Sequence, residues 1–66
     1  MPSAVGALED PKEGVRFQAA QAFQRMPKQG VRRAERTLRK VKERPDEAQE
    51  VKAAAEEALR TLADHD

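Results

Sequence analysis

The sequence has no cysteine, tryptophan or tyrosine, and two phenylalanines are its only aromatic side chains. Without cysteine there can be no disulfide, no thiolate metal ligand and no thiol nucleophile. No apolar run approaches the roughly 18 residues that a membrane-spanning helix requires, and the first ten residues lack the basic start of a secretory signal peptide. We therefore expect a soluble cytoplasmic protein.

Side chains that perform acid–base or nucleophilic chemistry are also scarce. The only hydroxyl groups are those of Ser3, Thr37 and Thr61, and the only imidazole is that of His65, one residue from the C-terminus. General acid–base catalysis needs groups held in a shielded pocket, and three adjacent residues such as 64–66 do not converge on one metal ion with good geometry. We expect no enzymatic activity, no metal, no cofactor and no small-molecule substrate.

The residues that are abundant favour helix throughout the chain. Alanine, glutamate, lysine, arginine, glutamine and leucine dominate, and no segment shows the alternation typical of strands. Prolines at positions 2, 11, 27 and 45 divide the 66 residues into about four segments. The sequence predicts a single all-α domain, residues 1–66, of three to four short helices at about 3–9, 11–26, 28–43 and 46–63.

Two of these helices carry a recognisable start signal. Asp10 can cap a helix that begins at Pro11, and Glu13 completes a capping box while it favours the positive end of the helix dipole. Asp46 and Gln49 repeat that arrangement after the third proline-bounded segment. These signals predict that the second and fourth helices begin alike.

The same two helices match each other when the chain is shifted by 36 residues. The shared apolar positions predict one buried face on each helix. In the first helix that face consists of Val15, Ala19, Ala22, Phe23 and Met26, and in the second of Val51, Ala55, Ala58, Leu59 and Leu62. Such a period lies in the range of helical repeat proteins, although two amphipathic helices of similar composition would also match this well.

The stretch LEDPKEGVRFQAAQAF closely resembles the second half of a HEAT-like repeat of the PBS-lyase type. Its pattern is met by Leu8, Asp10, Pro11, Val15, Arg16, Ala19, Ala20 and Ala22, with Phe23 where the family has leucine. A looser second copy, PDEAQEVKAAAEEAL, has lysine for the arginine and lacks both the preceding leucine and the proline after the aspartate. The resemblance implies a pair of helical hairpins or, where only the motif is shared, a small helical bundle.

The resemblance also implies roles for three kinds of residue. In that family the aspartate caps the second helix, the alanines allow close helix–helix approach, and the arginine reaches a carboxylate in the neighbouring repeat. Here Arg16 would pair with Asp46, and a pair between Asp10 and Lys52 is the less favoured one. The alternative is that both cations are simply solvated. Repeat arrays usually need three or more units, so end helices, a partner or a second copy would cover the faces that two units leave open.

Charge is strongly segregated although the net charge is only +1. Residues 28–44 hold eight basic and two acidic side chains, whereas residues 46–66 hold seven acidic and two basic ones. On the third predicted helix an apolar stripe of Val31, Ala34, Leu38 and Val41 lies opposite a basic one of Arg32, Arg33, Arg36, Arg39 and Lys40. We expect the basic helix either to form ion pairs with the acidic last helix or to contact an anionic partner.

The function that these observations favour is a non-enzymatic protein-interaction module built from a minimal HEAT-like repeat pair. Its predicted binding surface lies on the second helix and consists of Arg16, Phe17, Gln21 and Gln24. One alternative is a small nucleic-acid-binding protein that uses the basic stripe, although no aromatic residues are interleaved to stack on bases. The other is a homo-oligomeric structural element.

Overall fold

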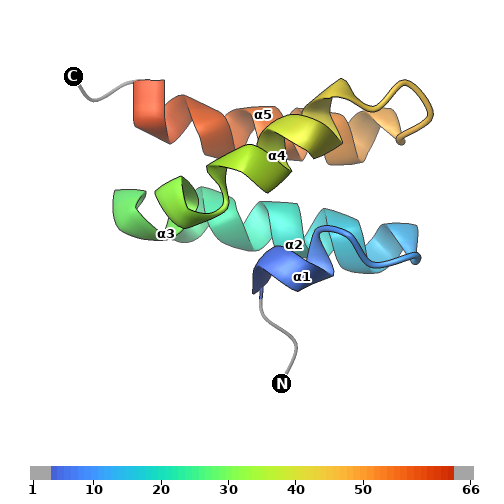
Figure 1. Cartoon of the computed structure of the whole chain (residues 1–66), viewed down its shortest axis with the longest axis horizontal. Helices are drawn as coiled ribbons and strands as arrows, with labels where there is room; N and C mark the ends of the chain where they lie inside the picture. The colour runs from blue at the N-terminus through green and yellow to red at the C-terminus, as the bar shows by residue number, and fades with distance from the viewer. Residues whose placement is uncertain (1–3, 64–66) are drawn as a thin grey trace.

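The structure, a computed structural model, describes residues 4–63, and within that range it is helical and has no strand. The described helices are α1 (Ala4–Ala7), α2 (Glu13–Arg25), α3 (Lys28–Arg33), α4 (Glu35–Glu43) and α5 (Gln49–Ala63) (Figure 1). The predicted all-α fold class is therefore confirmed.

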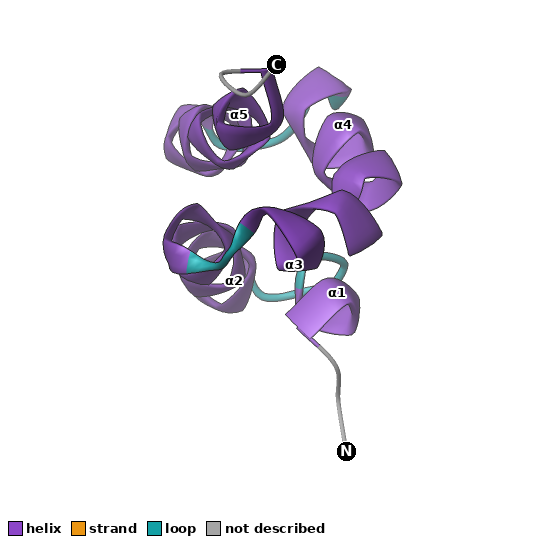
Figure 2. Cartoon of the chain, turned by 90° about the vertical axis from the view of Figure 1, so that its left-hand side faces the viewer, coloured by secondary structure: helices purple, strands orange, loops and turns teal. Residues whose placement is uncertain are grey.

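The helices form two layers. In one layer α2 and α5 lie side by side and run in the same direction, as Figure 1 shows. The contacts between them keep nearly the same separation in sequence. Arg16 contacts Glu47, 31 residues later, and Gln24 contacts Ala54, 30 residues later. The other layer contains α1 and α4 (Figure 2). The helix α1 packs on α2, and α4 runs along α5 in the opposite direction. The helix α3 lies between them and contacts both α2 and α5.

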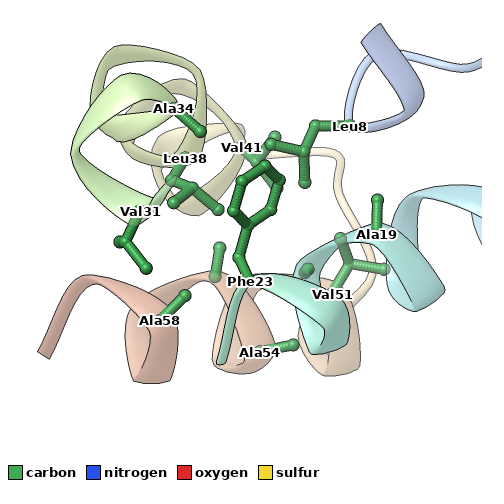
Figure 3. Packing of buried hydrophobic residues seen from close by; sticks show 12 residues of the cluster. Leu8, Ala19, Phe23, Val31, Ala34, Leu38, Val41, Val51, Ala54 and Ala58 are labelled. Carbon is green, nitrogen blue, oxygen red and sulfur yellow. The ribbon is translucent and has the colours of Figure 1, made fainter. Parts of the chain in front are cut away.

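The core fills the space between these layers and is built mainly from small side chains. Figure 3 shows the ring of Phe23 in the middle of the cluster, with Leu8, Leu38 and Val41 around it. The other buried apolar residues are Ala19, Ala20, Val31, Ala34, Val51, Ala54, Ala55 and Ala58. Alanines let α2 and α5 approach closely, but each buries little apolar area, so the stability gained per residue is small.

The third predicted helix is not continuous. It breaks at Ala34, whose φ of −101° and ψ of 7° lie in the bridge region between helix and strand. Neither proline nor glycine stands there, and no local residue preference accounts for the break. The break keeps Val31 in contact with the core while α4 follows α5.

The helix starts also differ from the prediction. The side chain of Asp10 accepts a hydrogen bond from the backbone N–H of Lys12 at 2.8 Å, which makes a turn, and α2 begins only at Glu13. In front of α5 it is Glu47, not Asp46, whose side chain accepts a backbone N–H, that of Ala48 at 2.9 Å. The first helix is shorter than predicted, and Ser3, its expected start, lies outside the described residues.

Burial contradicts the predicted faces at two positions. Val15 is 36% exposed and is the one large apolar side chain in residues 4–63 that is classed as exposed, while its match Val51 is fully buried. Ala22 is exposed as well, although its match Ala58 is buried. The two matched helices therefore share their residue types but not their surroundings.

Candidate functional site

The main charged surface of the molecule lies on α3 and α4, opposite their apolar residues. We define the cationic face as the exposed side chains of Arg32, Arg33, Arg36, Arg39 and Lys40. A groove opens on it at the break between the two helices and is lined by Arg32, Arg33, Glu35, Arg36, Thr37 and Arg39. The groove therefore joins the last residues of α3 to the first residues of α4 across the break.

Of the predicted ion pairs between the basic and the acidic segment, the described residues show one, from Arg44 to Glu47 at 4.0 Å in the turn between them. Although α4 packs along α5, the ion pairs of the described residues include none between these two helices. On the cationic face the ion pair is local: Arg39 pairs with Glu35 at 2.8 Å, one turn earlier on α4. Such an exposed i,i+4 pair is worth a few tenths of a kcal/mol. Apolar packing holds α4 against α5, and the guanidinium groups point outward.

A second polar cluster lies between α2 and the loop in front of α5. The side chain of Arg16 donates two hydrogen bonds to the carboxylate of Glu47, from Nε to Oε2 at 2.7 Å and from Nη2 to Oε1 at 2.9 Å. Its Nη1 donates to the carbonyl oxygen of Asp10 at 2.8 Å. The guanidinium thus joins the turn before α2 to the turn before α5, and the predicted partner Asp46 was wrong by one residue.

The surroundings of this pair favour its charged form. The side chain of Glu47 is only 2% exposed, and the hydrogen bonds from Arg16 lower its pKa, helped by the N–H of Ala48 and by Arg44, although burial opposes the shift. The same hydrogen bonds raise the pKa of Arg16. Because both acceptor oxygens are occupied, the cluster has a structural role in joining the two parts of the molecule.

The other residues of the predicted α2 surface are spread around the helix. Phe17 is half-buried and packs against the core. Gln24 is exposed, but its amide donates to the carbonyl oxygen of Ala54 on α5 at 3.2 Å. Gln21 faces solvent. Two of the four predicted residues, Arg16 and Gln24, are thus engaged in contacts within the molecule.

Features of other kinds of site are absent from residues 4–63. No group of three or more potential metal-ligating side chains comes together there. The hydroxyl of Thr61 donates to the carbonyl oxygen of Ala58, one turn earlier. Residues 64–66, at which no metal site is expected, lie outside the described residues. None of the described helices has the length and hydropathy of a membrane span.

The sequence does not mark three residues of these clusters as site residues: Glu35, Thr37 and Glu47. The matching pattern points to Asp46 and not to Glu47, and a single glutamate or threonine on a helix has no characteristic spacing. No signal in the sequence distinguishes Glu47 from Asp46, since both are acidic and both follow Pro45. Nothing in the sequence indicates that Thr37 lines a groove.

Comparisons of the chain with protein-family models, with curated proteins and with solved structures found no match. The resemblance to HEAT-like repeats therefore remains a prediction from the motif.

Proposed function

We propose that the chain is a non-enzymatic, cytoplasmic interaction module built as a pair of HEAT-like units, and that its cationic face binds an acidic partner protein. In this proposal α1 and α2 form the first unit, and α3, α4 and α5 form the second. The observation that carries it is the set of exposed cations on α3 and α4 that α5 does not neutralise.

The layered arrangement supports the repeat part of the proposal. The parallel helices α2 and α5 lie side by side, and each is backed by the preceding helical segment in the other layer. Arg16 links the first unit to a carboxylate at the start of the second, as the family motif implies, with Glu47 in place of the aspartate.

The groove supports the choice of an anionic partner. Four arginines line it, and a guanidinium presents a planar fork of donors that matches a carboxylate with two hydrogen bonds. The same fork also matches phosphate, which keeps nucleic acid as the second candidate. The groove residues include no aromatic side chain on which a base could stack. A carboxylate-rich protein surface is therefore the favoured ligand.

The test is a titration followed by fluorescence anisotropy, with a labelled glutamate-rich peptide, duplex DNA and single-stranded RNA as separate probes at two salt concentrations. The binding variant carries Arg33→Glu and Arg36→Glu. The control carries Lys12→Glu and Arg25→Glu, which are exposed positions outside the groove. Each reversal removes two charge units, so both variants change from +1 to −3.

We expect the peptide to bind the native chain and the control variant, to lose at least tenfold in affinity on the binding variant, and to weaken with salt. If the nucleic acids bind and the peptide does not, the second candidate replaces the first. If no probe binds at low salt, the cationic face is not a binding surface.

A further inference from the structure

None of the helices described in residues 4–63 covers the side of α2 that faces away from α5. Gln24, which contacts α5, follows Val15 by nine residues, and at 3.6 residues per turn this places the two on opposite sides of α2. We call Val15, Gln18 and Ala22 the leading flank, and all three are exposed. Their matches 36 residues later, Val51, Ala54 and Ala58, are at most 5% exposed because α2 and the outer layer cover them.

The opposite situation holds at the other end of the molecule. We call Lys52, Glu56 and Leu59 the trailing flank of α5. Lys52 and Glu56 stand two residues on either side of Ala54, which contacts α2, so they lie on nearly the opposite side of the helix. Their matches on α2 are Arg16, Ala20 and Phe23, of which the last two are buried. On the trailing flank Glu56 is exposed, and Lys52 and Leu59 are half-exposed.

The exposure of matching residues thus differs between the two units in a regular way. Positions that face the other unit are buried or half-buried, and the matching positions that face away from it are exposed or half-exposed, with Leu59 also packed against the edge of the core. The internal contact between α2 and α5 is therefore made of two complementary surfaces, and each has an uncovered counterpart elsewhere on the molecule. On α5, the facing side of α2 helps to cover Val51 and Ala58. The leading flank lacks an equivalent helix side against it.

Charge points to the same pairing. Arg16 reaches from α2 to Glu47 in the turn before α5. Its match Lys52 takes part in none of the ion pairs within residues 4–63. The turn before α2 and the first residue of that helix carry three carboxylates, Glu9, Asp10 and Glu13, against the single cation Lys12, and none of the three takes part in an ion pair within the same residues. A cation on the trailing flank and an acidic turn beside the leading flank are complementary.

We propose that the trailing flank of one copy packs on the leading flank of a second copy, so that the α2–α5 contact is repeated between molecules. Leu59 then covers Val15 and Ala22 of the second copy, and Lys52 reaches the acidic turn at residues 9–13. The contact joins two different surfaces, so it is head-to-tail, leaves one flank open at each end and allows further copies to add. This inference goes beyond the proposed function, since it uses neither the groove nor the cationic face.

The experiment is sedimentation velocity over a concentration series at low salt. For the native chain we expect the average mass to rise continuously with concentration. Val15→Glu blocks the leading flank and Lys52→Glu blocks the trailing flank, so each variant alone should stay at the monomer mass. Gln21→Glu is the matched control for Val15→Glu, because it adds the same kind of charge on an exposed face of α2 outside the flank, and it should associate like the native chain. Far-UV circular dichroism checks that all variants are folded.

The decisive sample is an equimolar mixture of the Val15→Glu and Lys52→Glu variants. Each retains the flank that the other has lost, so head-to-tail packing predicts one productive contact and a species of twice the monomer mass that grows no further. A native chain that stays monomeric at every concentration overturns the proposal. So does a native chain that stops at a dimer while the mixture stays monomeric, since that result indicates face-to-face packing of like flanks.

Discussion

Phe23 has the largest buried side chain of the core, and its truncation tests how the fold is stabilised. The ring is 2% exposed and lies among side chains from the α1–α2 turn and from α4. Phe→Ala substitutions in cores cost about 3–5 kcal/mol. At 0.05–0.15 kcal/mol per residue, a chain of this length has a total stability of about 3–10 kcal/mol. The Phe23→Ala change is therefore comparable to the whole stability.

The neighbours of Phe23 place the cost at the upper part of that range. Leu8 lies in the turn after α1, whereas Leu38 and Val41 lie on α4, so no single shift closes the hole that the missing ring leaves. Leucine stands at the matching position of α5, Leu59, and Phe23→Leu should cost only about 1–2 kcal/mol because an aliphatic branch still fills part of the space.

Urea unfolding followed by circular dichroism measures both variants, with Gln21→Ala as an exposed control. We expect Phe23→Ala to be largely unfolded without urea and Phe23→Leu to unfold at a lower midpoint than the native chain. A loss below about 1 kcal/mol for Phe23→Ala would refute the reasoning, because it would mean that the ring does not hold the two layers together.

Two further predictions concern the loss of stability at low pH and the first turn of α2. Because hydrogen bonds from Arg16 lower the pKa of Glu47 below its ordinary value of 4.5, this group stabilises the fold above that value and ceases to do so as the pH falls through its lowered pKa. Melting temperatures measured between about pH 3 and 7 should therefore fall less steeply for Glu47→Gln than for the native chain, and equal slopes would remove Glu47 as a cause. Gly14 lies in the first turn of α2 and a Cβ there would meet nothing within 4 Å, so Gly14→Ala should stabilise by about 0.5–1 kcal/mol; a lower urea midpoint would contradict this.

The helices were predictable because composition and punctuation agree in this sequence. Alanine, leucine and glutamate favour helix everywhere, and the prolines at 11, 27 and 45 fall between helices in the structure. The apolar stripe of Val31, Ala34, Leu38 and Val41 is fully buried, as its spacing predicted. The cationic face follows from the same spacing, since the residues between the apolar ones must point the other way.

The break at Ala34 and the burial of the flanks were beyond sequence reasoning for a different reason. Alanine has the highest helix propensity, so no local preference marks position 34 as an interruption. Val15 and Val51 occupy matching positions, yet one is exposed and the other buried, because burial depends on whether another helix lies alongside. Likewise Glu47 and Asp46 are both acidic, and only the path of the turn decides which one meets Arg16.

The alanine-rich contact between α2 and α5 has a consequence for how the fold responds to temperature. The heat capacity of unfolding grows with the apolar surface that becomes exposed, and an average domain of 66 residues would show about 0.8–1.0 kcal/mol/K. Half of the buried apolar side chains here are alanines, which expose little on unfolding. The heat capacity change should therefore lie below that value. A small heat capacity change flattens the curve of stability against temperature, so the same close packing that keeps the maximum stability low also makes it change little between cold and warm conditions.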